Sequence, residues 1–324
     1  DLFGSDPFED GLGRSLSLGQ RWNAGGGLSL FQEAQLSDRA GTSGRGQNLG
    51  MDYNIARHWQ LGLRYAQSRI EDAEGGETLR RSGTVLASYN DSRTSFTPRF
   101  EYRRDRGAQA RNQYLLSVGL TRKFSEDWRT ALRLRTSLTR DLQDRNDDAR
   151  FTEASVGLAY RPADSGRWAW LSKYTYLYDL GTVAQISPTS GVANNSVDQR
   201  AHIAATEVLY RINPVWEVGG KYAYRNGELR EGRNTGTWYE NTRHFVAGQV
   251  RYRVLQSWDV LVEHRWLQTV QDKNQRSGWL AGVDKQITPH FRLGVGYNFT
   301  DFSDDLRHSD YRYKGWYLNA VGVY

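Results

Sequence analysis

Apolar and polar residues alternate one by one along much of the chain. Positions 59–65 carry Trp, Leu, Leu and Tyr at the odd numbers and Gln, Gly and Arg at the even numbers. The same alternation returns over 216–225, 291–299 and 314–324. Because successive side chains of a strand point to opposite faces, the pattern predicts β-strands with one apolar and one polar face.

Seven short polar turns, each leading into an aromatic residue, separate these stretches. Eight longer segments rich in Gly, Asp, Asn and Arg lie between the turns, at 38–46, 72–80, 104–111, 141–149, 180–199, 228–242, 272–277 and 303–313. Turns and loops together predict about 16 strands within residues 27–324, most of about 9–14 residues, enough to cross a bilayer when tilted. Residues 1–26 are interpreted as a periplasmic lead-in or a partial strand. The lead-in is favoured, and the alternative raises the strand count to about 17 or 18.

The composition fits membrane-spanning strands. No run of 18 apolar residues exists, 25% of the residues are charged, and the mean hydropathy is −0.73. In a transmembrane barrel only every second strand residue meets lipid, so the average stays polar. The 11 Trp and 19 Tyr residues suit membrane–water interfaces. The sequence therefore predicts an all-β protein, an antiparallel up-and-down transmembrane β-barrel of about 16 strands in the outer membrane of a Gram-negative bacterium.

The two faces of the predicted strands have different tasks. Aromatic residues that open the upward strands predict a periplasmic girdle: Trp59, Phe96, Trp128, Trp168, Trp216, Trp258 and Phe291. Arg or Lys facing mid-membrane lipid costs about 2–4 kcal/mol, so the charged face must line the lumen. The basic lumen residues are Arg64, Arg99, Arg103, Arg133, Arg135, Arg161, Lys221, Arg225, Arg251, Arg253, Arg265 and Arg292. Acidic residues share that face: Asp52, Glu101, Glu153, Glu207, Glu217, Asp259, Glu263 and Asp284.

Three interpretations of this charged face stay open. Basic residues outnumber acidic ones, so an open lumen would favour anions. Alternatively, the charges form an ion-paired ladder that merely fills the lumen. A third possibility is a dedicated track for a polyanion.

Other chemistry finds little support. His264 lies on the predicted lipid face without a nucleophilic Ser and an orienting partner at suitable spacing, so we expect no enzyme. The acidic loop 144–148 and the cluster Asp301, Asp304 and Asp305 lack the glycine and closing Glu of an EF-hand, so we expect solvated loops, no metal and no cofactor. The net charge of +6 is spread along the chain, which argues against nucleic acid. Loop 180–199, the longest, is the candidate to fold inward or contact a partner.

Several stretches from about residue 95 onward carry a resemblance. They are 100–105, 157–162, 174–180, 247–252 and, most distinctively, 294–305 followed by Lys314-Gly315-Trp316. They resemble the C-terminal outer-membrane barrel domain of large, repeat-bearing proteobacterial envelope proteins, over roughly two-thirds of the chain. The resemblance implies a membrane-embedded tail of a larger protein and supplies no catalytic residues. The terminal aromatic Tyr324 resembles that family's assembly signal.

Two functions follow as hypotheses. The first is a pore or translocation channel for transport or secretion, forming the membrane-embedded part of a larger envelope protein. The second is a closed-lumen barrel that anchors a surface or periplasmic domain. The expected partners are outer-membrane lipid and lipopolysaccharide, the barrel-assembly machinery, and an upstream domain or periplasmic partner. Asp1 in place of a start Met indicates a processed or excised chain.

Overall fold

The computed structural model describes residues 14–39, 42–72, 75–107, 110–142, 147–180, 197–231, 236–288, 290–300, 302, 306 and 314–322. These residues form 18 strands: β1 (Arg14–Gly25), β2 (Leu28–Arg39), β3 (Thr42–Ala56), β4 (Trp59–Asp72), β5 (Glu77–Asn90), β6 (Thr94–Gly107), β7 (Arg111–Lys123), β8 (Trp128–Asp141), β9 (Asp147–Tyr160), β10 (Trp168–Leu180), β11 (Val197–Arg211), β12 (Trp216–Glu231), β13 (Tyr239–Glu240), β14 (Arg243–Leu255), β15 (Trp258–Thr269), β16 (Asn274–Thr288), β17 (Phe291–Asn298) and β18 (Gly315–Gly322). The described residues contain no helix that is long and apolar enough to span a membrane.

The all-β, antiparallel up-and-down architecture is confirmed, but the predicted count of 16 strands is too low. One difference lies in the segment before residue 27. Arg14 to Gly25 form β1, which pairs with β2 from Arg14↔Asp38 to Gly25↔Leu28. The lead-in interpretation therefore does not hold for these residues. The other difference is β13, a two-residue strand that pairs with β12, as β14 does.

Strands also extend further than the alternation of apolar residues indicated. β2 ends at Arg39 and β3 begins at Thr42, so most of the predicted loop 38–46 belongs to a hairpin. The register runs unbroken through Arg39↔Thr42. Beyond the lipid zone both faces of a strand meet water, so the hydropathy pattern fades while the backbone ladder continues.

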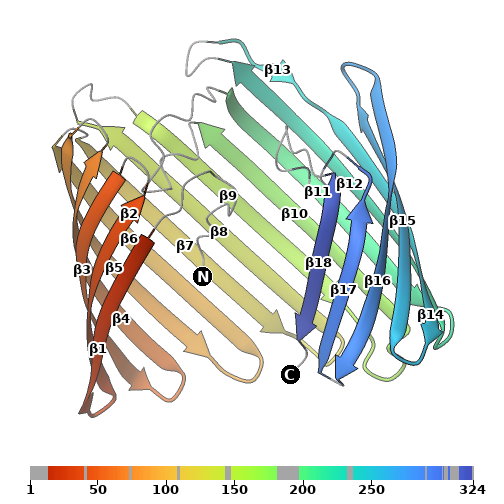
Figure 1. Ribbon diagram of the computed structural model, residues 1–324, viewed down its shortest axis with the longest axis horizontal. Coiled ribbons are helices and arrows are strands. Elements are labelled where there is room, and N and C mark those ends of the chain that lie inside the picture. Colours follow the sequence, from red (N-terminus) through yellow and green to blue (C-terminus); the bar gives the residue numbers. More distant parts are fainter. Residues whose placement is uncertain are drawn as a thin grey trace. The chain divides into compact units, whose positions relative to one another are not determined.

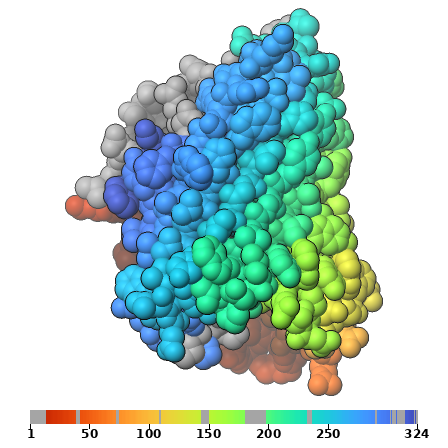
Figure 2. Space-filling model, turned by 90° about the vertical axis from the view of Figure 1, so that its right-hand side faces the viewer, coloured from red at the N-terminus to blue at the C-terminus, as the bar shows by residue number. Residues whose placement is uncertain are grey.

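The chain divides into two compact units. Unit 1 comprises residues 1–119, 135–151 and 181–195; unit 2 comprises 120–134, 152–180 and 196–324. In unit 1 each of the strands β1 to β6 pairs with the next. In unit 2 the same holds from β10 to β18, with β12 pairing with both β13 and β14. Figure 1 shows neighbouring strands of each unit pointing in opposite directions, and Figure 2 shows those of unit 2 side by side from green to blue.

Tight turns are closed by polar side chains in a repeated way. The side-chain oxygen of Asp91 accepts from the backbone N–H groups of Arg93 and Thr94, at 2.7 and 2.6 Å. Asn213 and Ser125 hold the donors two and three residues further on in the same manner. The hydroxyl of Tyr89 donates to Asp91 at 2.6 Å. That bond, followed by the two backbone donors, lowers the pKa of Asp91 below its usual value.

Burial along the strands is the reverse of that in a water-soluble protein. Large apolar side chains are exposed on one face, which we call the outward face; Leu63, Val85 and Val295 are 43%, 51% and 46% exposed. Charged residues such as Asp52 and Glu101 are 6% exposed on the other, polar face. Apolar exposure of this extent requires a non-aqueous environment, and a strand with lipid on one side and polar groups on the other provides it.

Candidate functional site

The polar face of unit 1 is built around buried carboxylates. Asp52 lies on β3, where Nη2 of Arg64 donates to its Oδ1 at 2.6 Å and Nη1 of Arg21 donates to its Oδ2 at 3.4 Å. Both guanidinium groups also lie near the ring of Phe31, with centroid distances of 4.4 and 5.5 Å. Glu101, on β6, is shared between Arg99 and Arg103 at 2.7 and 3.1 Å. Each carboxylate is thus compensated by two cations.

A further pair in this unit has the geometry of a two-pronged ion pair. Nε and Nη2 of Arg80 donate to Oδ1 and Oδ2 of Asp105, each at 2.8 Å. Parallel bonds of this kind fix the guanidinium orientation as well as supplying energy. Arg80 was not among the lumen residues predicted from the sequence, although its position continues the one-by-one alternation of β5.

Unit 2 repeats the arrangement on its own polar face. Arg251 lies between Asp284, at 3.3 Å, and Glu217, at 3.9 Å. Asp259 is shared between Arg253 and Arg292, at 3.1 and 3.8 Å. Arg265 pairs with Glu263. These contacts join β12, β14, β15, β16 and β17 through side chains of opposite charge.

Near the loop ends of unit 2 the polar face is covered. Arg225 of β12 is fully buried, and its Nη1 donates to the backbone oxygen of Leu306 at 2.6 Å. Its Nη2 donates to the side chain of Gln199 at 3.0 Å. Phe302 packs edge-on against Phe245, with ring centroids 6.4 Å apart, and both are buried. Phe302 and Leu306 therefore pack on an apolar patch of the polar face, formed by Ala201, Ile203, Ala223, Phe245, Ala247 and Leu267.

This inward segment was not predicted. The sequence favoured loop 180–199 for that position, and residues 181–196 lie outside the described part of the chain. Position 302 follows a Gly-Tyr-Asn-Phe-Thr stretch whose alternation continues that of β17. No periodic signal marks the point where the chain leaves the strand. The alternation of residues therefore could not predict the contact between Arg225 and Leu306, which are 81 residues apart.

The predicted basic lumen residues have three kinds of environment. Seven form ion pairs: Arg64, Arg99, Arg103, Arg251, Arg253, Arg265 and Arg292. Arg225 binds Leu306, and Lys221 lies 5.7 Å from the ring of Phe245. Within the described residues Arg133, Arg135 and Arg161 have no side-chain ion pair, and Arg161 follows β9 at a turn.

The aromatic residues proposed as a girdle lie at the tight-turn ends of their strands. Six of the seven are the first residue of a strand, and Phe96 is the third residue of β6. Four of the Trp residues lie in tilted contact with a Tyr ring of the neighbouring strand, with centroids 4.4–5.1 Å apart, as Trp59–Tyr89, Trp128–Tyr160, Trp168–Tyr210 and Trp216–Tyr252. The Tyr partners were not predicted, although each stands near the end of its strand.

The remaining candidates gain no chemical role from the structure. His264 is exposed on the outward face, with its ring 4.6 Å from that of Trp279. Among the described residues no group of His, Asp and Glu could hold a metal ion. Residues 143–146, Asp301, Asp304, Asp305 and Tyr324 lie outside the described part, so the statements about them stay predictions.

Comparisons with known proteins support the fold. No protein-family model matches the sequence, and no curated protein matches it. Among solved structures, the FrpB iron transporter from Neisseria meningitidis is similar with a TM-score of 0.57 and 11% identity, over 95% of this chain and 62% of that one. The ferric citrate transporter FecA in its unliganded form gives 0.52 and 14%, over 94% of this chain and 60% of that one. The chain thus spans about three-fifths of the length of either transporter.

The similarity establishes that this chain has the fold of outer-membrane β-barrels. This fold agrees with the predicted localisation in the outer membrane of a Gram-negative bacterium. Both neighbours are transporters, and at these identities the likeness concerns the fold alone.

Proposed function

We propose that the chain forms an outer-membrane channel for ions and small polar solutes, with a lumen lined by compensated ion pairs. One observation carries this function: the guanidinium groups of the ion pairs are partly accessible. Side chains of Arg64, Arg99, Arg251 and Arg253 are 27%, 37%, 28% and 44% exposed, whereas their acidic partners are mostly buried. A lumen filled to dryness would bury both partners, so the exposure favours a water-filled path along this face.

Ion pairing also revises the expected selectivity. A neutralised arginine contributes little to the field in a pore, so the count of basic residues overstates the preference for anions. Arg133 and Arg135 share the face of the buried Ser137 and Thr139 on β8 and have no acidic partner among the described residues. These two arginines are therefore proposed to supply a weak anion preference.

Selectivity measurements in planar bilayers test this function. Parent protein should give discrete conductance steps with a weak anion preference that declines as salt screens charges over about 10 Å at 0.1 M. Arg133→Gln/Arg135→Gln should move the permeability ratio toward equality. The matched control is Arg81→Gln/Arg104→Gln, which removes the same charge from the outward face and should leave the ratio unchanged. Cation preference of the parent, or an equal effect of the control, would contradict the proposal.

The anchor stays as a second candidate, because Phe302 and Leu306 pack against residues of β11, β12, β14 and β15 on the polar face. A bilayer that shows no conductance after folded protein has inserted would support the anchor. The resemblance to barrel domains of large envelope proteins supports a role as the tail of a longer chain under either function. Conductance of that longer chain, compared with the barrel alone, tests this part of the proposal.

A further inference from the structure

Arginines gather on the outward face of unit 1, at the loop ends of β3 to β6. They are Arg45, Arg69, Arg81, Arg104 and Arg106, all exposed, and we call them the arginine row. Arg45 lies directly opposite Arg69, and Arg81 directly opposite Arg104. Arg69 and Arg106 both neighbour Arg81 diagonally, because each is opposite Leu79. Five cations thus occupy four adjacent strands.

Such a row is unfavourable without an anion. Side chains directly opposite on one face have Cβ atoms about 5 Å apart, and like charges there are destabilising. Arg69 pairs with Glu77 at 3.0 Å. Within the described residues, the side chains of Arg45, Arg81, Arg104 and Arg106 form no ion pair or hydrogen bond. The arginines of the polar face differ from those of the row, since seven of the predicted lumen arginines have carboxylate partners.

Apolar side chains lie below the row on the same face, beyond an intervening level formed by Gln47, Gln67, Gly83 and Tyr102. Four residues along each strand from an arginine come Leu49, Tyr65, Val85 and Phe100, which are 45–51% exposed. At about 3.4 Å per residue the two levels are roughly 14 Å apart. A ligand that uses both levels must carry anionic groups at one end and hydrocarbon at the other.

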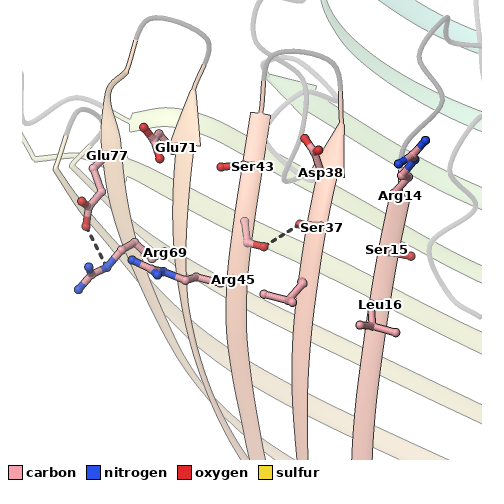
Figure 3. A pocket seen from close by; sticks show the side chains of 12 residues that line it. Arg14, Ser15, Leu16, Ser37, Asp38, Ser43, Arg45, Arg69, Glu71 and Glu77 are labelled. Atoms are coloured by element: carbon pink, nitrogen blue, oxygen red, sulfur yellow. Dashed lines mark hydrogen bonds and ion pairs between the residues drawn. The ribbon is translucent and has the colours of Figure 1, made fainter.

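The surface between the strands is hollowed at this level. A groove of about 540 Å³ is lined by Leu36, by the arginines Arg14, Arg45 and Arg69, and by the carboxylates Asp38, Glu71 and Glu77. Figure 3 shows Arg45 and Arg69 extending at the same height from adjacent strands, with Arg69 bound to Glu77. A second groove of about 450 Å³ continues along Leu36, Arg45, Gln47 and Arg69. Both grooves place guanidinium groups beside the aliphatic side chain of Leu36.

We propose that the arginine row binds the phosphate groups of a phosphorylated glycolipid in the outer leaflet, the chemistry of the lipid part of lipopolysaccharide. Guanidinium groups bind phosphate through two parallel hydrogen bonds, which lysine cannot do. The acyl chains lie along the apolar level, which a free phosphate or an acidic protein would leave unused. This inference goes beyond conduction and does not depend on whether the lumen is open.

Native mass spectrometry of the folded barrel in detergent tests the site. The probe is diphosphorylated lipid A, compared with its dephosphorylated form and with inorganic phosphate. The variant is Arg45→Gln/Arg81→Gln/Arg104→Gln, which spares Arg69 because that residue is paired. The matched control, Arg57→Gln/Arg93→Gln/Arg122→Gln, removes three exposed arginines at the opposite, tight-turn end.

We expect the parent to retain lipid A in preference to its dephosphorylated form. Each arginine near an anionic lipid is worth about fivefold in affinity, so the row variant should lose lipid A by well over tenfold and the control by less than twofold. The Lys counterparts at positions 45, 81 and 104 keep the charge and should bind at an intermediate level. Equal binding by row variant and parent, equal loss in the control, or full competition by inorganic phosphate at equal phosphate concentration would each overturn the proposal.

Discussion

Asp52 illustrates how a charged residue is accommodated within a membrane-crossing strand. Each of its carboxylate oxygens has one arginine partner, and the side chain is almost fully buried. Replacing one partner leaves a buried charge with incomplete compensation, whereas replacing both members of the pair removes the problem. Asp52 and Arg64 were predicted for this face from parity alone. Arg21 was not, because the segment that carries it was interpreted as a lead-in.

We predict that Arg64→Gln lowers the free energy of unfolding by about 1–3 kcal/mol, since Arg21 still compensates part of the charge. Arg45→Gln, on the outward face of the adjacent strand, should change it by less than about 0.5 kcal/mol. Asp52→Asn/Arg64→Gln should recover most of the loss. Denaturant unfolding followed by Trp fluorescence measures all three. A loss that the double variant does not reduce would show that the pair is not the cause.

At the scale of the strand, most of the fold was accessible from the sequence. Alternation identifies strands and their faces, and polar turn residues such as Asp91 and Asn213 identify the tight turns through the backbone donors that they bind. Strand ends at the loop side were not accessible, because residues such as Arg45 and Arg69 interrupt the apolar pattern without interrupting the ladder. β1 carries the alternation as well, with Leu16, Leu18 and Trp22 on one face, and a partial strand was one of the two interpretations of residues 1–26.

Depth along one face of a single strand gives the second prediction. Leu63→Arg places a charge among the exposed apolar residues of β4 and should cost about 2–4 kcal/mol or prevent folding. Gln67→Arg, four residues further on the same face, lies at the level of the arginine row directly opposite Arg81, so like-charge repulsion should cost it only about 0.2–1 kcal/mol. Heat-modifiable migration and unfolding free energy distinguish the two. Equal tolerance of both substitutions would mean that the apolar level of β4 does not face lipid.

At the scale of the whole chain, the composition and the resemblance pointed to an outer-membrane barrel, and the fold agrees. The ion-paired nature of the polar face was one of three open interpretations. Only side-chain geometry distinguishes a paired arginine such as Arg251 from one such as Arg133, which has no ion pair among the described residues. The contact between Arg225 and Leu306 joins residues far apart in sequence, so no local pattern predicts it. The aromatic pairs across neighbouring strands, such as Trp168–Tyr210, also join residues that are distant in sequence.

The central claim is that one face of each strand meets lipid while the other meets water inside a barrel. The chain contains no Cys, so single cysteines can be introduced without a background signal. In membranes, Leu132→Cys on the outward face of β8 should resist a charged, water-soluble thiol reagent, and Arg133→Cys should react readily. Both should react in denaturant. Protection of both positions in the folded protein would indicate a dry lumen, and reaction of Leu132→Cys with protection of Arg133→Cys would contradict the assignment of the faces.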